Sequence, residues 1–363
     1  MKKKQFKRDF DYWIDEYMYN CRSRKLRPKT MQSYEQSLRL FERWCQEEAN
    51  ITEPEQVLET TIRHYICSLQ ERGKYTFYAV ENCAITYDPA RRRDFSQAVS
   101  TTTINNYIRN LKAFFTWYAD TTQSANPMVK IRQLRNERKA QEYLEDHEIE
   151  KLLRIFDRSY FPEHRDFMVI MLILDTGMRL GECLQVTTDD LDMDDRTICL
   201  PAENTKGRRT RYVFFSVKTA KSLQRWLRYK DRYTSGKLLF SKKSGLPLEI
   251  HSFESGFRKY LGRAGIDKAY SPHALRNNFA KRCLMNGMDI YTLSRILGHS
   301  SVAVAENAFF GKYFLPKKAK ERIQMSNNNN QINVPRVVRP WTSSRYLSDR
   351  KWVSTCRAAT MVT

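Results

Sequence analysis

Two arginines and two histidines in the second half of the chain have the types and spacing that phosphate chemistry needs. Arg179 lies in the run TGMRLGE, His273 and Arg276 lie in SPHALR, and His299 lies in LGHSS. His273 and Arg276 are three residues apart, so a helix would place them on one face. A phosphodiester under attack gains negative charge, which fixed guanidinium groups can offset, and histidines can donate or move protons there. Glu182, one turn beyond Arg179, is placed to orient that arginine or a neighbouring histidine.

Lys206 and Phe309 extend this candidate site. Lys206 lies in TKGR between two strand-like stretches, residues 197–200 and 210–215, and Phe309 follows His299 by ten residues. Taken singly, each candidate has a plain structural interpretation. An arginine in a helical run is usually a surface ion pair, a histidine after Leu-Gly is usually a cap or core residue, and Lys206 is one hairpin charge among several. Independent surface residues have no reason to follow this order, so the set as a whole favours a phosphoryl-transfer site.

The order and spacing of these motifs resemble those of the tyrosine recombinase, or phage integrase, family, from about Arg27 to about Ile323. In that family a tyrosine joins the 3′ phosphate of DNA and frees a 5′ hydroxyl. The covalent link conserves bond energy, so strands are resealed without ATP, a metal or another cofactor. The resemblance implies double-stranded DNA at specific recombination sites as the partner, with a homo-oligomer on the DNA: a dimer on each site and a tetramer in synapsis.

The resemblance also implies a role for each site residue. Arg179 and Arg276 would clamp the phosphate that is cut, because a planar guanidinium donates two hydrogen bonds and stays charged. His299 would donate a further hydrogen bond to the same phosphate, and His273 would act as acid or base near the nucleophile. Lys206 would protonate the departing sugar oxygen. No residue is assigned to a metal or a cofactor.

Phe309 stands where the resemblance leads us to expect the nucleophilic tyrosine. Family tyrosines lie nine or ten residues beyond the histidine of LGH, and here Ala308 and Phe309 occupy those places, with no tyrosine before Tyr313. Phenylalanine keeps the ring and lacks the hydroxyl, so we expect a form that binds DNA and does not cleave it. Deliberate substitution and natural loss both remain open as its origin. In a further interpretation Phe309 is a core residue and Tyr313 is the nucleophile, one helical turn or about 5–6 Å away.

The charge of the chain favours a polyanionic partner independently of the motifs. The 363 residues carry 63 Lys and Arg against 41 Asp and Glu, a formal net charge of +22. Such an excess suits binding to a phosphate backbone, although a ribosome-binding or membrane-surface protein could be equally basic. No apolar run approaches the roughly 20 residues of a membrane helix. We therefore expect a soluble, intracellular protein that is not associated with a membrane, and the resemblance implies the cytoplasm of a bacterium, on the nucleoid.

The eight cysteines show neither a Cys-x-x-Cys pair nor metal-ligand spacing. Several fall in apolar stretches, which indicates buried free thiols. The sequence therefore predicts no metal centre.

Periodicity and composition predict a mainly α protein with a small β-sheet. Apolar residues recur at helical spacing over residues 28–48, 61–69 and 103–118, which indicates a helical bundle. We predict an N-terminal helical, core-binding domain over residues 1–126 with an inserted loop near 74–100, a basic linker over 127–142, a mixed α/β catalytic domain over 143–325 and a low-complexity basic tail over 326–363. Within the catalytic domain we expect strands at 197–200 and 210–215, and helices at 167–174, 217–229, 252–263, 273–285, 290–297 and 302–310. By resemblance, the two domains would close around DNA as a clamp.

Four functions fit these observations. The leading one is a site-specific recombinase, integrase or transposase of a mobile element, in a form that cannot cleave. The second is a natural DNA-binding relative that has lost its nucleophile and regulates or bridges DNA. A type IB topoisomerase would use similar chemistry without synapsed partners, and a basic two-domain protein could bind nucleic acid without catalysis.

Overall fold

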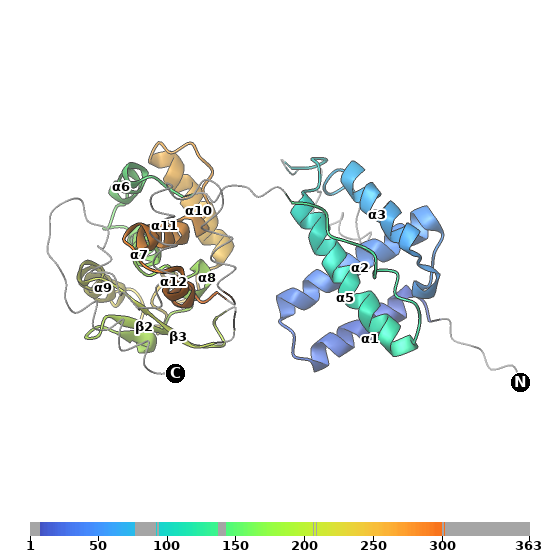
Figure 1. Cartoon of the computed structure of the whole chain (residues 1–363). Coiled ribbons are helices and arrows are strands. Elements are labelled where there is room, and N and C mark those ends of the chain that lie inside the picture. The colour runs from blue at the N-terminus through green and yellow to red at the C-terminus, as the bar shows by residue number, and fades with distance from the viewer. Residues whose placement is uncertain are drawn as a thin grey trace, which may run out of the picture. The chain divides into compact units, whose positions relative to one another are not determined.

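The chain divides into two units, each with its own apolar core (Figure 1). The computed structural model describes residues 8–76, 92, 94–136, 143–205, 207, 209–299 and 301. The units are Met1–Arg138 and Lys139–Thr363. Several of the predicted features lie outside the described residues: Lys206, Phe309, the helix at 302–310, most of the inserted loop and the tail over 326–363.

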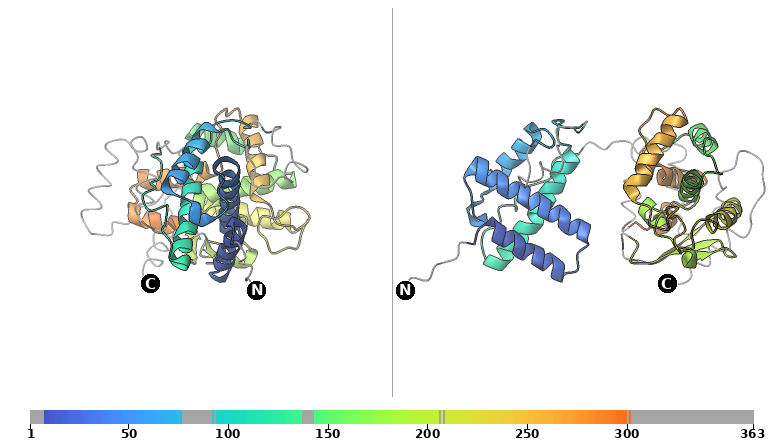
Figure 2. Two further views of the ribbon diagram at one scale, coloured as in Figure 1. Left: turned by 90° about the vertical axis from the view of Figure 1, so that its right-hand side faces the viewer. Right: turned by 180° about the vertical axis from the view of Figure 1, so that it is seen from behind.

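The N-terminal unit is a helical bundle, and its predicted helices are confirmed with slightly longer bounds (Figure 2). Asp9 caps the first helix by accepting a hydrogen bond from the backbone N of Tyr12 at 3.0 Å, and Ser100 caps the last in the same way. The first helix was not predicted, although Phe10, Trp13 and Tyr17 share its buried face. The elements are α1 (Phe10–Ser23), α2 (Pro28–Ala49), the short η1 (Pro54–Gln56), α3 (Glu59–Glu71) and α5 (Thr101–Thr122).

The segment that we predicted as a linker begins as part of this bundle. Met128 and Ile131 are buried in the N-terminal core. The side chain of Asn105 on α5 holds the backbone of Leu134, accepting from its N at 2.8 Å and donating to its O at 2.9 Å. The described residues 127–136 are therefore anchored to the bundle at Met128, Ile131 and Leu134, and the extended linker predicted over 127–142 does not begin at 127.

The C-terminal unit packs helices around a small antiparallel sheet, as the sequence predicts. The strands β1 (Leu191–Asp192), β2 (Thr197–Leu200) and β3 (Arg211–Phe214) lie in the order β1-β2-β3, with Ile198 opposite Val213. The helices and the short 3-10 turn of this unit are α6 (Asp146–Arg154), α7 (Phe161–Thr176), α8 (Leu180–Cys183), η3 (Thr188–Asp190), α9 (Val217–Lys230), α10 (Ile250–Arg263), α11 (His273–Met285) and α12 (Ile290–Leu297). The helix α7 is buried nearly all round and packs against α11 and α9.

The described cysteines are free thiols, and four of the six are buried: Cys21, Cys45, Cys183 and Cys283. Across the described part of the chain, no helix combines the length and the apolar composition that crossing a membrane requires.

A second asparagine fixes the start of the C-terminal unit. Asn278 on α11 is 2 % exposed, accepts a hydrogen bond from the backbone N of Leu144 at 2.9 Å and donates one to its O at 2.6 Å. Asn105 and Asn278 thus make the same pair of hydrogen bonds, to Leu134 and Leu144. The two asparagine side chains therefore hold the backbone of the chain on either side of the connection between the units.

Asn278→Ala should lower the free energy of unfolding of the C-terminal unit by about 2–4 kcal/mol, because two buried backbone groups lose their partners. Urea denaturation followed by tryptophan fluorescence and limited proteolysis would measure it. Asn136→Ala is the matched control, since Asn136 is exposed and its amide bonds only the hydroxyl of Thr102, at 3.2 Å. Equal effects of the two substitutions would contradict the anchoring role.

Candidate active site

Arg179 is positioned by the sharp turn that ends α7. Gly177 ends the helix with a φ of +68°, and a Cβ at this position would lie 2.3 Å from the ring of Phe279. Glycine is required there for both reasons. Arg179 is then the N-cap of α8, and Glu182 accepts hydrogen bonds from its backbone N at 2.8 Å and from its Nη1 at 2.9 Å.

The end of α12 is the point where the site is assembled. Its last carbonyls have no partners within the helix and form the negative end of the helix dipole. Three consecutive carbonyl oxygens accept hydrogen bonds from three arginines. Ile296 O accepts from Nε of Arg211 at 3.2 Å, Leu297 O from Nη2 of Arg276 at 2.7 Å, and Gly298 O from Nη2 of Arg179 at 3.2 Å.

Gly298 allows this convergence and delivers the next residue into it. Its φ of +64° is left-handed, and a Cβ would lie 3.1 Å from side-chain atoms of Arg211. Gly298 is therefore the left-handed C-cap of α12. His299 follows at once, with its backbone N bonded to Ser294 O at 3.0 Å. The glycine therefore places His299 directly beside the three guanidinium groups.

Arg276 links the ends of two helices. It is 3 % exposed, and its Nη1 donates to Gly177 O at 2.8 Å while its Nη2 holds Leu297 O. Burial, and then the charge of Arg179, lower the pKa of Arg276 to about 9, so it remains charged at neutral pH. His273 begins the same helix, α11, and is accessible to solvent.

Glu182 is shared by two arginines. It is 3 % exposed, and besides Arg179 it accepts hydrogen bonds from Nη1 of Arg211 at 3.1 Å and from Nη2 at 2.6 Å. Burial raises the pKa of Glu182, but hydrogen bonds and charge from Arg211 and Arg179 outweigh it and hold the pKa below its usual range. The carboxylate therefore stays ionised, as a buried anion needs partners to do.

The sequence analysis treated Arg211 as one of several hairpin charges and did not include it in the site. The sequence nevertheless contained a pattern that could have identified Arg211. Side chains alternate between the two faces of a strand, so Arg211 shares a face with the apolar Val213, while Tyr212 points away. In the structure Val213 is buried and Tyr212 is exposed. A charged residue on the buried face of a strand needs partners, which Glu182 and Ile296 supply.

Lys206 lies outside the described residues, and the structure fixes only what precedes and follows it. Thr205 is 2 % exposed; its hydroxyl oxygen lies 3.1 and 2.9 Å from the carbonyl oxygens of Ala202 and Arg209 and accepts a hydrogen bond from the backbone N of Arg209 at 3.1 Å. The described ends of this turn are therefore held together. Phe309 also lies outside the described residues.

The positive cluster controls the protonation of the histidines. Burial, and then the charges of Arg276, Arg179, His273 and Arg211, lower the pKa of His299 to about 4. Desolvation, and then Arg276 and Arg179, also lower the pKa of His273. Both imidazoles are neutral at pH 7, and each can donate one hydrogen bond.

The assembled residues form a positively charged cluster whose chemistry suits an anion. Three guanidinium groups face a single carboxylate, and the side chain of Arg179 keeps 25 % exposure, so this arginine can still be reached. Within the described ranges, no group of His, Cys, Asp and Glu has an arrangement that could hold a metal ion. Charge stabilisation by arginine and proton transfer by neutral histidine are the chemistry that the arrangement offers.

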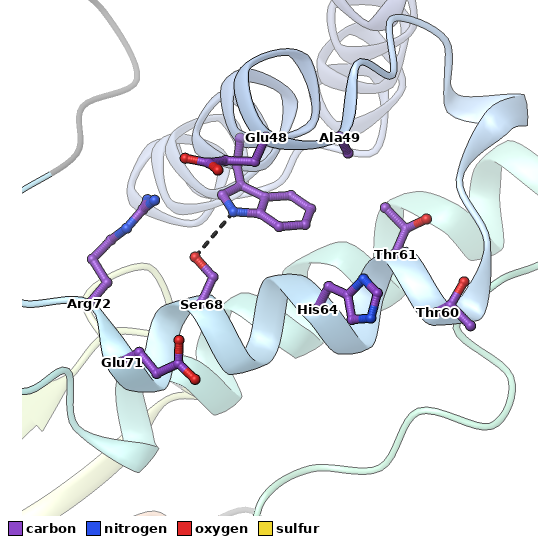
Figure 3. Close-up of a pocket in the computed structure, with 9 residues that line it drawn as sticks. Glu48, Ala49, Thr60, Thr61, His64, Ser68, Glu71 and Arg72 are labelled. Carbon is purple, nitrogen blue, oxygen red and sulfur yellow. Dashed lines mark hydrogen bonds between the residues drawn. The ribbon is translucent and has the colours of Figure 1, made fainter.

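The N-terminal unit has a separate cavity of about 700 Å³ between α2 and α3 (Figure 3). Trp44 Nε1 donates to the hydroxyl of Ser68 at 3.1 Å across one side of it, and acidic and basic side chains mix around its rim. None of the predicted site residues lines this cavity. It is therefore unrelated to the arginine cluster.

Comparisons with known proteins found similar sequences and a similar fold. The sequence model of the phage integrase family matches residues 142–310. A tyrosine recombinase XerC of Listeria monocytogenes is 25 % identical over 304 residues, which cover 81 % of this chain and 88 % of the relative. A XerC of Lactobacillus delbrueckii is 26 % identical over 61 % of this chain and 78 % of the relative. The fold is similar to that of the Tn1549 transposon integrase in complex with transposon right-end DNA, with a TM-score of 0.64 and 19 % identity, covering 87 % of this chain and 98 % of that one.

The histidine protonation can be tested in the protein without DNA. We expect the imidazole of His299 to stay neutral as the pH falls from 8 to 5 and to titrate at about 4, because burial and the arginines disfavour its cation. NMR titration of histidine-labelled protein, with His299→Gln to assign the signal, would measure the midpoint. A midpoint near the ordinary histidine value of about 6.5 would contradict the arrangement.

Proposed function

We propose that this chain is a member of the tyrosine recombinase, or phage integrase, family, whose sequence model matches residues 142–310, and that it is a site-specific recombinase, integrase or transposase. In this proposal it cuts and rejoins DNA at specific recombination sites through a 3′-phosphotyrosyl intermediate. The observation that carries it is the convergence of Arg179, Arg276 and His299 at the end of α12. These are the residues that the sequence motifs single out, and they come from different parts of the chain.

The proposed mechanism gives each residue one task at the phosphate. Arg179 and Arg276 hold its non-bridging oxygens and offset the charge that grows during in-line attack. His299, neutral at pH 7, donates a hydrogen bond without adding another cation. His273 exchanges a proton with the nucleophile, and Lys206 gives a proton to the departing 5′ oxygen.

Arg276 is suited to a fixed role and Arg179 to a more open one. Arg276 is almost fully buried and has one donor on each of two helix ends, so its position is set before a phosphate arrives. Arg179 is held by Glu182 and Gly298 and keeps an exposed edge. A preorganised clamp costs little reorganisation when charge develops, which is the source of electrostatic catalysis.

We further propose that Phe309 occupies the position of the nucleophile and that this chain, as written, does not cleave. A tyrosine ring without its hydroxyl keeps its packing and cannot attack phosphorus. In support, the Tn1549 integrase with transposon end DNA was solved as a variant in which a phenylalanine replaces a tyrosine. A naturally inactive relative that regulates or bridges DNA is the second candidate, favoured by the same Phe309 and by the otherwise complete site.

The proposed partners follow from the chemistry and the charge. The net charge of +22 suits double-stranded DNA, and strand exchange between two sites needs a dimer on each and a tetramer in synapsis. With bacterial relatives and DNA as the substrate, the proposed location is the bacterial cytoplasm, on the nucleoid.

Phe309→Tyr should restore cleavage. On a nicked suicide substrate, in which the cut strand loses a short fragment and cannot be resealed, we expect a 3′-phosphotyrosyl adduct for Phe309→Tyr and none for the unaltered chain. A denaturing gel would show the adduct as a slower band that protease removes.

Phe310→Tyr is the matched control, because it adds the same hydroxyl at the neighbouring position. An adduct with the unaltered chain, or with Phe310→Tyr and not with Phe309→Tyr, would overturn the assignment of the nucleophile.

Arg179→Ala, made in the Phe309→Tyr background, should lower the single-turnover rate of cleavage by roughly 100-fold or more, the scale of losing one preorganised donor. Binding should remain, since one phosphate contact among many is lost and Glu182 keeps Arg211. Arg225→Ala on the exposed face of α9 removes the same charge as a control. Cleavage that survives Arg179→Ala would remove this residue from the site.

A further inference from the structure

Two arginines share Glu182, and Arg211 on β3 is the less exposed of the two. Its side chain is 12 % exposed, compared with 25 % for Arg179. Its Nε, Nη1 and Nη2 all donate to protein acceptors: one to Ile296 O and two to the carboxylate of Glu182. Three of its five N–H groups, one on each nitrogen, are thus used within the protein, and its side chain is mostly buried, so Arg211 is less available than Arg179 to hold a substrate phosphate.

The two partners of Arg211, Glu182 and Ile296, are each connected to a different residue of the proposed site. Glu182 holds Arg179, through both the backbone N and Nη1. Ile296 belongs to the last turn of α12, which leads through Gly298 to His299. Arg211 is thereby bonded to the partner of one phosphate-binding residue and to the helix that carries the other.

The side chain of Arg211 also packs closely against the backbone turn at Gly298. Three side-chain atoms of Arg211, Cδ, Cζ and Nε, lie 3.1 Å from the place where a Cβ of Gly298 would be. The guanidinium plane therefore lies against the turn that reverses the chain before His299. Both the hydrogen bonds and the packing fix the turn relative to β3.

Charge alone does not explain this arrangement. A lysine at position 211 would supply the same positive charge to Glu182, but its ammonium is a compact point charge and lacks a planar fork. An arginine fork can bond both oxygens of one carboxylate and keep its Nε for a third acceptor. The observed contacts use this geometry in full.

We propose that Arg211 is a positioning residue for DNA cleavage, which fixes Arg179 through Glu182 and His299 through the end of α12. The proposal rests on the function proposed above. Arg211 itself does not touch the phosphate; it sets the distance and angle between two groups that do. Its removal should impair the reaction step and spare DNA affinity.

The first test measures cleavage and binding separately in the Phe309→Tyr background. Arg211→Gln and Arg211→Lys should both lower the single-turnover cleavage rate by roughly 10- to 100-fold, the scale of losing a charged hydrogen-bond network. Their DNA affinity should match that of the control Arg225→Gln, which removes an exposed charge from α9. Normal cleavage by Arg211→Lys would show that only the charge matters and would overturn the proposal, as would a loss of affinity that accounts for the slower cleavage.

A double-substitution cycle tests whether Arg211 acts through His299. In the His299→Gln background the additional effect of Arg211→Gln on cleavage should be much smaller than in the His299 background, because residues that act as a unit are not additive. Fully additive effects would contradict a positioning role at His299.

The second test needs neither DNA nor a nucleophile, so it separates this proposal from the proposed function. In NMR spectra of the full chain, Arg211→Gln and Arg211→Lys should both move the ring signals of His299, and Arg225→Gln should not. Unmoved signals in both Arg211 variants would overturn the proposal even if Phe309→Tyr cleaves. If Phe309→Tyr forms no adduct while the signals move, the nucleophile assignment fails and the positioning role stands. Should Arg211→Gln not fold, Arg211→Lys, which keeps the buried charge, decides both tests.

Discussion

The negative end of α12 is the constraint on which the site depends. Three neighbouring carbonyl oxygens there accept hydrogen bonds from arginines of β3, α11 and the N-cap of α8. Guanidinium groups this close repel one another, so they need the helix end and the carboxylate of Glu182 to hold them together. With three cations against one carboxylate, the cluster retains an excess of positive charge. A phosphate bound there would complete the balance, and the protein would not have to rearrange to receive it.

Two left-handed glycines make this convergence possible. Gly177 ends α7 and Gly298 ends α12, with φ values of +68° and +64°. Each turn frees carbonyls at a helix end, and Arg276 spans the two by bonding Gly177 O and Leu297 O. A Cβ at Gly177 would clash with the ring of Phe279 at 2.3 Å, and a Cβ at Gly298 would lie 3.1 Å from Arg211 and require that side chain to shift. The glycines in the two short motifs are thus as necessary to the geometry as the charged residues beside them.

The sequence predicted those parts of the fold that local signals determine. The bounds of β2, α11 and α12 were predicted to the residue, because a hairpin pattern, a proline before His273 and a glycine after Leu297 mark them. What it did not predict depends on partners far away in the chain. The packing of Met128 and Ile131 on the bundle needs Asn105 to hold Leu134, and a charged stretch gives little sign of that. Arg211 was overlooked because a cluster of charges hides the alternation of faces along β3.

In the proposed function, the arginine cluster would also link phosphate binding to proton transfer. The positive charge that would attract a phosphate also lowers the pKa of His299 and His273, so both imidazoles are neutral at pH 7 before a phosphate binds. A bound phosphate would bring negative charge close to them and favour their protonated forms, because an opposite charge raises a histidine pKa. The pKa of each histidine would then rise when DNA is bound and fall when it leaves.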